Sequence, residues 1–156
     1  MAQPPAMQID TNTIYQVVIE TDRGTITMEL DPRLAPNTVN NFVSLARDGY
    51  YDGLTFHRVV PDFVIQGGCP QGTGTGGPGY KFEDEPVKGE YKRGAVAMAN
   101  SGKNTNGSQF FICIDDCTRK LDKAYNLFGY VTDGIDVALG TQVGDTMQSV
   151  TIEEQG

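Results

Sequence analysis

The chain has 156 residues, enough for one domain with a sizeable core and too few for two ordinary ones. Its hydrophobic share of 38% and charged share of 21% are ordinary for a globular protein, which excludes disordered and membrane-embedded classes. A net charge of −8 repels phosphate backbones, and the Lys and Arg residues are scattered, so we expect no nucleic-acid partner and no membrane association.

The chain begins with a segment that shows no sign of regular structure. Residues 1–12 precede the first apolar run, and we expect them to form a flexible leader ahead of a single domain that spans residues 13–156. Met1–Gln8 contains no Lys or Arg and no long apolar run, so it does not resemble a secretion signal. We therefore expect a cytoplasmic location.

Two strands and one helix are predicted in the first part of the domain. Ile14–Thr21 is apolar and β-branched, and Thr25–Leu30 alternates between apolar and polar side chains, so the two are predicted to form a hairpin with one buried face. Ala35–Arg47 has a proline in its first turn and apolar residues at helical spacing, which predicts a helix. The stripe expected to face the core is Val39, Phe42, Val43 and Ala46.

Six further short apolar runs, separated by glycine-rich turns, are predicted to be strands. They are Thr55–Val60, Phe63–Gln66, Ala95–Ala99, Phe110–Ile114, Leu127–Val131 and Met147–Ile152. Eight short strands in one small domain favour a closed barrel, because closure leaves no sheet edge exposed. Gly134–Leu139 is predicted to be a short second helix.

Familiar metal and nucleotide motifs are incomplete. The chain has three cysteines, Cys69, Cys113 and Cys117, with no second cysteine pair and a single histidine, so we expect no structural zinc site. An odd number of cysteines without a secretion signal predicts free thiols. The glycines of residues 72–77 match the spacing of a dinucleotide-binding loop, but Pro78-Gly79 follows where that loop needs a helix. We therefore expect no nucleotide and no other cofactor.

His57 is the only histidine, so a serine or cysteine nucleophile would have to use it. Side chains on a strand alternate between its faces, so we expect only one of His57 and Arg58 to line a site. A lone histidine on a strand is more often structural than catalytic. Arg58, taken alone, is as readily interpreted as a surface charge as a site residue.

Two stretches, residues 56–68 and 98–112, place charged or amide side chains beside aromatic ones. Their polar and aromatic members include Arg58, Phe63, Gln66, Gln109 and Phe111. Taken singly, the two phenylalanines would be interpreted as core residues and the amides as turn residues. Together they predict an apolar pocket with one cation and several amides but no general base, which suits the binding of a peptide better than hydrolysis.

Both stretches resemble the two signature segments of cyclophilins. They read FHRVVPDFVIQGG and MANSGKNTNGSQFFI, and the similarity runs in order from Tyr15 to Asp136. The resemblance implies a mainly β fold, a closed eight-stranded antiparallel barrel capped by two α-helices, and peptidyl-prolyl cis–trans isomerase activity without a cofactor. By position, the residues that would line an active groove on the outside of the barrel are Arg58, Phe63, Val64, Gln66, Ala99, Asn100, Gln109, Phe111, Leu121 and Tyr125.

The resemblance also implies a division of roles. Arg58, Gln66 and Phe63 would be catalytic. Arg58 donates hydrogen bonds toward the twisted amide, Gln66 positions a carbonyl and helps to orient Arg58, and Phe63 helps to hold the proline ring. The other groove residues would bind proline-containing peptides and folding proteins, and the protein is expected to act as a monomer. The alternative is a cyclophilin-fold module that binds proline-containing segments without significant turnover.

Three positions depart from the family pattern. Lys120 stands where many eukaryotic members carry a tryptophan that assists binding of the inhibitor cyclosporin, Tyr125 stands where a histidine is common, and Val64 replaces a usual methionine. We expect activity to be retained and the affinity for cyclosporin-type inhibitors to be weakened. The region of residues 132–146 is shortened, so the second helix is expected to be short.

Overall fold

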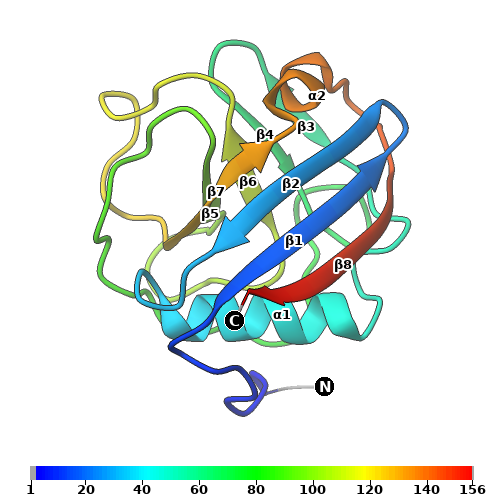
Figure 1. Ribbon diagram of the computed structural model, residues 1–156. Helices are drawn as coiled ribbons and strands as arrows, with labels where there is room; N and C mark the ends of the chain where they lie inside the picture. Colours follow the sequence, from blue (N-terminus) through cyan, green and yellow to red (C-terminus); the bar gives the residue numbers. More distant parts are fainter. Residues whose placement is uncertain (1–2, 156) are drawn as a thin grey trace.

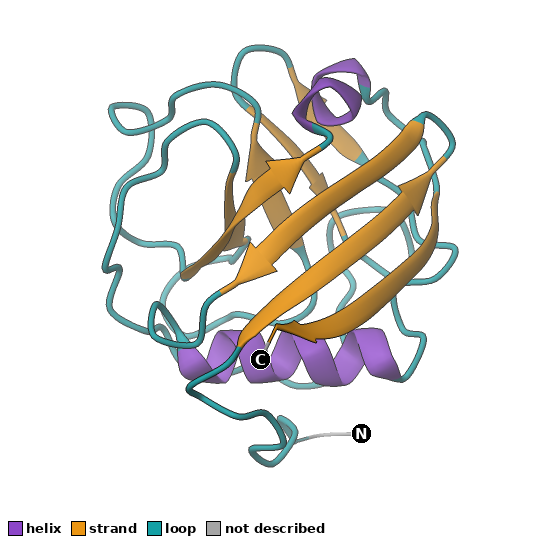
Figure 2. Cartoon of the chain, in the orientation of Figure 1, coloured by secondary structure: helices purple, strands orange, loops and turns teal. Residues whose placement is uncertain are grey.

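The computed structural model describes residues 3–155, which form eight strands and two helices (Figures 1 and 2). The elements in chain order are β1 (Ile14–Thr21), β2 (Gly24–Leu30), α1 (Pro36–Arg47), β3 (Arg58–Val60), β4 (Val64–Gly67), β5 (Ala95–Met98), β6 (Phe110–Cys113), β7 (Leu127–Asp133), α2 (Ile135–Gly140) and β8 (Met147–Gln155). The predicted hairpin and both predicted helices are confirmed. Within the described residues, neither helix has the length and apolar character that a membrane span requires.

The strands form one antiparallel sheet, in the order β3-β4-β6-β5-β7-β2-β1-β8, that curls into a half-barrel (Figure 1). The prediction of a closed barrel is not confirmed, because no strand ladder joins the outer strands β3 and β8 in the described residues. The two edges are linked by an isolated bridge between Thr55 and Thr146 and by neighbouring backbone hydrogen bonds. The strand predicted from Thr55 begins only at Arg58 and is too short to complete the ladder.

The two helices lie at opposite ends of the half-barrel (Figure 1). The residue before α1 is Ala35, whose side chain has no group that can cap the helix. Glu85, which is distant in the sequence, caps the helix instead. Its carboxylate accepts hydrogen bonds from the backbone N–H of Asn37 and Thr38 and from the Thr38 hydroxyl. The contact anchors the segment before β5 to the start of the helix, where a negative charge is favourable.

The two faces of the sheet pack against different hydrophobic clusters. Ile65 on β4 pairs with Ile112 on β6, and Ile112 pairs with Val96 on β5. All three belong to the main core, which also contains Phe42 of α1. The residues on either side of them along each strand face outward, so the half-barrel presents a second, smaller apolar cluster on its outer face.

The segment of residues 3–12 contains no helix or strand and lies against α1. The backbone N–H of Gln8 donates to Asn40 Oδ1 at 2.8 Å, and Asn40 Nδ2 donates to the carbonyl of Ala6 at 3.0 Å. Ile9 is only 8% exposed and joins the main core. The segment is thus docked by backbone hydrogen bonds and one buried side chain, and its flexibility stays a prediction.

Candidate active-site groove

The strand register places the candidate catalytic side chains in one row on the outer face of the half-barrel. Arg58 on β3 pairs with Gln66 on β4, Gln66 pairs with Phe111 on β6, and Phe111 pairs with Ala97 on β5. Directly paired residues of antiparallel strands project from the same face. The row therefore presents a guanidinium, an amide and a phenyl ring side by side, and it ends at the buried Ala97.

A cavity of about 550 Å³ opens along this row, lined by both apolar and polar residues; we call it the apolar cavity after the side chains of its buried wall. Among the candidate residues it gathers Arg58, Phe63, Val64, Gln66, Ala99, Asn100, Phe111, Leu121 and Tyr125. Its buried wall is formed by Val64 and Phe111, which are 2% and 4% exposed. Phe111 meets Tyr125 edge to face at 5.6 Å between ring centroids, which is a favourable aromatic geometry. The cavity thus combines a fixed apolar lining with one cation at its edge.

Two of the walls come from loops that backbone contacts hold in place. Phe63 lies in the turn between β3 and β4, and its carbonyl accepts a hydrogen bond from the N–H of Ile114 at 2.9 Å. Tyr125 is held by Tyr91, whose hydroxyl donates to the Tyr125 carbonyl at 2.6 Å and accepts from the Tyr125 N–H at 3.1 Å. These contacts fix both aromatic rings relative to the sheet.

A chain of side-chain hydrogen bonds runs from the cation to a glycine-rich loop. Arg58 Nη1 donates to Gln66 Oε1 at 3.3 Å, and Gln66 Nε2 donates to Gln109 Oε1 at 3.1 Å. Gln109 Nε2 then donates to the carbonyls of Gly74 and Gly76 at 2.9 and 3.0 Å. The bond to Gln66 is the one side-chain hydrogen bond of Arg58 within residues 3–155, so its other N–H groups are available to a ligand.

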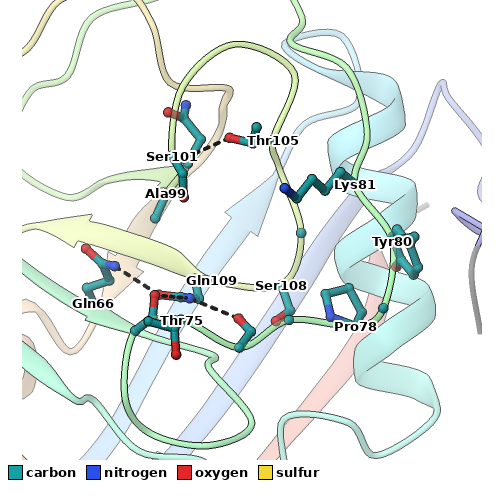
Figure 3. A pocket seen from close by; sticks show the side chains of 16 residues that line it. Gln66, Thr75, Pro78, Tyr80, Lys81, Ala99, Ser101, Thr105, Ser108 and Gln109 are labelled. Carbon is teal, nitrogen blue, oxygen red and sulfur yellow. Dashed lines mark hydrogen bonds between the residues drawn. The ribbon is translucent and has the colours of Figure 1, made fainter.

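A second cavity of about 750 Å³, lined mainly by glycines and polar residues, adjoins the first and shares Gln66, Gly74, Ala99 and Asn100 with it. Gln109 lines this second cavity and not the apolar one. Figure 3 shows Gln66 and Gln109 on one side and Lys81 on the opposite side. Lys81 is the one charged residue in its lining. The two cavities together form a continuous groove that an extended peptide could follow.

His57 lines the apolar cavity together with Arg58, so the expectation that only one of them would line a site is wrong. The alternation rule fails because β3 begins at Arg58, which leaves His57 in the preceding loop. Burial, with a contribution from the Arg58 charge, lowers the pKa of His57, so the imidazole is neutral near pH 7. Thr73 and Gly74 also line the cavity, and no sequence signal predicts that their loop folds back toward His57.

The three cysteines are free and buried. Cys113 and Cys117 belong to the outer cluster beneath the groove, and burial raises the pKa of both thiols. Cys69 lies under the glycine-rich loop, where its Sγ accepts hydrogen bonds from the N–H groups of Gly74 and Gly76 at 3.3 Å each. Burial raises the pKa of this thiol, but the backbone hydrogen bonds outweigh burial and lower it to about 7.

Comparisons with known proteins agree on the family to which the chain is similar. Residues 16–155 match the family described as cyclophilin type peptidyl-prolyl cis-trans isomerase/CLD. The chain is 49% identical over 139 residues to a peptidyl-prolyl cis-trans isomerase of Synechococcus elongatus, covering 88% of this chain and 95% of that protein. It is 51% identical over 134 residues to peptidyl-prolyl cis-trans isomerase B of Bacillus subtilis, covering 85% and 93%.

A solved structure extends the likeness to the fold. A cyclophilin type peptidyl-prolyl cis-trans isomerase of Cryptosporidium parvum, crystallised in the presence of the dipeptide ala-pro, has a TM-score of 0.81 to this chain at 33% identity. The similarity covers 88% of this chain and 98% of that one. With the family match spanning nearly the whole chain, this protein belongs to the cyclophilin-type peptidyl-prolyl cis-trans isomerases.

Proposed function

We propose that this protein accelerates rotation about X–Pro amide bonds in peptides and folding proteins, by non-covalent stabilisation of the twisted amide. The observation that carries the proposal is the position of the Arg58 guanidinium at the edge of an apolar cavity walled by Phe63 and Phe111. The activity named for the bacterial relatives, at about half identical residues, supports the same conclusion.

The chemistry needs no nucleophile or general base. An amide rotates slowly because its C–N bond is partly double, with a barrier of about 18–20 kcal/mol. At the twisted transition state conjugation is lost, and the prolyl nitrogen gains a free lone pair. A donor that binds this state better than either planar isomer lowers the barrier, and a reduction of about 7 kcal/mol corresponds to roughly 10⁵-fold acceleration.

The proposed roles follow the positions of the groups. Phe63, Phe111 and Leu121 hold the proline ring, and Arg58 donates to the prolyl nitrogen or the neighbouring carbonyl while Gln66 keeps it oriented. Asn100 acts through its backbone, because its side chain is already engaged: Nδ2 donates to the Ala124 carbonyl at 2.9 Å and Oδ1 accepts from the Gly102 N–H at 3.1 Å. The substrate therefore pairs with Asn100 in the manner of an added strand.

The remaining groove residues complete the binding site in this proposal. Val64 and Tyr125 finish the wall of the proline cavity, and Ala99 and Gln109 line the path of the chain toward the polar cavity. All these residues come from one chain, which supports action as a monomer. Three buried free thiols support a cytoplasmic location, because free cysteines are typical of a reducing compartment.

The proposal is tested with a protease-coupled isomerase assay on a short Ala-Pro peptide. The protein should accelerate exchange, and Arg58→Ala should lose most of the turnover while its circular dichroism and thermal midpoint stay those of the parent. The alternative, a proline-binding module without significant turnover, predicts peptide binding but no acceleration by either protein. Equal turnover in the parent and in Arg58→Ala would disprove the role of the guanidinium.

A further inference from the structure

Two residues that line the cavity proposed to hold the proline ring, Phe63 and Leu121, come from loops that are far apart in the sequence, and one lysine joins these loops. Lys120, next to Leu121, donates from Nζ to the carbonyl of Asp62, next to Phe63, at 2.6 Å. The same Nζ lies 3.4 Å from Asp115 Oδ2.

We propose that Lys120 is a positioning residue, which ties the β3–β4 turn to the loop of residues 115–121 and so sets the width of the proline cavity. The proposal rests on the isomerase function proposed above. Lys120 itself does not line either cavity. It acts through Phe63, which follows its hydrogen-bond partner Asp62, and through Leu121, its own neighbour in the sequence.

The β3–β4 turn is closed by its own hydrogen bond, from the Phe63 N–H to the Val60 carbonyl at 3.1 Å, and contacts tie it to the neighbouring loop on both sides. On its C-terminal side, the Phe63 carbonyl accepts hydrogen bonds from the Ile114 N–H and from Cys117 Sγ, which fix it to the neighbouring loop. On its N-terminal side, Asp62 is exposed and has a φ of 62°, a left-handed conformation that non-glycine residues adopt at a cost. Within the described residues, the bond from Lys120 is the one hydrogen bond that Asp62 makes.

The opposite loop presents the lysine at the right place. The backbone N–H groups of Lys120 and Leu121 both donate to the carbonyl of Cys117, at 3.0 and 3.2 Å, which forms a tight turn anchored on a buried residue. Leu121 packs from this turn against the outer cluster. Because the anchored turn cannot shift freely, the lysine transmits its position to Asp62 and to the ring beside it.

The expected effect is moderate. The side chain of Lys120 is 44% exposed, and an exposed ion pair with Asp115 alone stabilises little. A hydrogen bond from an ammonium to a carbonyl is stronger, and it ties to the neighbouring loop the one side of the turn that has no other contact with that loop. Loss of the tie should widen the cavity for substrate and transition state alike. This raises KM by about three- to tenfold and leaves kcat within about twofold.

The test uses two substitutions at this position and one matched control. Lys120→Met keeps the aliphatic stem and removes the donors, whereas Lys120→Arg keeps a cationic donor. Lys123→Met is the control. Like Lys120, Lys123 contacts a backbone carbonyl and a carboxylate: its Nζ contacts the carbonyl of Gly89 and lies 2.8 Å from Glu90 Oε2. Unlike Lys120, it has no contact with a residue next to Phe63, and it lines neither cavity. For each protein, kcat and KM on an Ala-Pro peptide and the urea unfolding midpoint are measured.

The proposal expects a raised KM in Lys120→Met, recovery of most of the loss in Lys120→Arg, and parental kinetics in Lys123→Met. It is overturned if KM of Lys120→Met stays within twofold of the parent, if Lys123→Met shows the same loss, or if Lys120→Arg recovers nothing. A lower unfolding midpoint with unchanged kinetics also overturns it, because the lysine would then be structural only. Absence of turnover in the parent protein would refute the isomerase function instead.

Discussion

Arg58 and Gln66 lie directly opposite each other on β3 and β4, and the guanidinium donates to the carboxamide oxygen at 3.3 Å. Both ends of the Gln66 amide are occupied, since its nitrogen donates to Gln109. Gln109 is in turn anchored on two backbone carbonyls of the glycine-rich loop. The direction of the exposed guanidinium is therefore determined by a chain of contacts that ends in the backbone.

This chain predicts a graded loss of turnover. Arg58→Ala removes the donor and should lower kcat by about 10²–10³-fold, as for loss of a donor to a transition state. Gln66→Met keeps the length of the side chain but frees the guanidinium, and should lower kcat by roughly tenfold. Gln109→Met acts one step further away and should cost less. The measurement is kcat on one Ala-Pro peptide for the three variants; parental kcat in Gln66→Met would contradict the orienting role.

Much of the fold could be predicted from local pattern. The strand β2 alternates strictly, and α1 carries its apolar residues at helical spacing, so sequence periodicity is enough to place both. The state of the barrel could not be predicted, because closure depends on whether β3 and β8 pair, and no local pattern shows that β3 starts after Thr55, which makes only an isolated bridge to Thr146. Strand counting gives the number of strands but not the pairing of the two edges.

Family resemblance predicts most of the residues of the site, but it does not predict the contacts between them. The pairing of Arg58 with Gln66 and of Gln66 with Phe111 depends on register, which no local pattern reveals. The prediction that only one of His57 and Arg58 lines the site is wrong because β3 begins three residues later than the predicted Thr55. The contact of Lys120 with Asp62 spans 58 residues and involves a backbone carbonyl, so side-chain identity gives no signal for it.

Inhibitor binding offers a second prediction, which rests on the family pattern at position 120. The family resemblance implies that Lys120 stands where many eukaryotic members carry a tryptophan that assists cyclosporin binding, so the parent protein should bind cyclosporin more weakly than those members. Lys120→Trp should tighten inhibition by at least roughly tenfold, because a buried aromatic surface stabilises such complexes strongly. The inhibition constant is measured in the isomerase assay. A nanomolar constant for the parent would contradict the prediction.

A third prediction concerns the stability of the sheet at Gly129. This residue of β7 pairs with Leu30 of β2, and a Cβ on it would lie 2.4 Å from the backbone carbonyl oxygen of Glu29. The strand would have to move away, so Gly129→Ala should lower the free energy of unfolding by about 2–4 kcal/mol. The control is Gly140→Ala, where a Cβ meets open space and stability should change by less than about 0.5 kcal/mol. Urea unfolding of both variants measures the difference; equal stability would show that the strands relax.

The last prediction concerns the pH dependence of stability and uses Cys69. Hydrogen bonds from the backbone lower the pKa of its thiol to about 7 in the folded protein, whereas an unfolded thiol titrates near 8.5. The folded state therefore favours the thiolate, and its contribution to stability is fully present above the unfolded pKa and is lost as pH falls through about 7. Relative to Cys69→Ser, the parent should gain on the order of 2 kcal/mol of unfolding free energy between pH 6 and 9.

Two measurements separate this thiol from the others. Thiolate absorbance near 240 nm should rise with a midpoint near pH 7 in the parent, and this transition should vanish in Cys69→Ser. It should persist in Cys113→Ser, because burial raises the pKa of Cys113 and keeps that thiol protonated over the same range. The N–H groups of Gly74 and Gly76 do not stabilise a thiolate if the absorbance of the parent rises only near pH 9. The same conclusion follows if the parent and Cys69→Ser show the same dependence of stability on pH. In that case the charge on Cys69 does not help to hold the glycine-rich loop beside the groove.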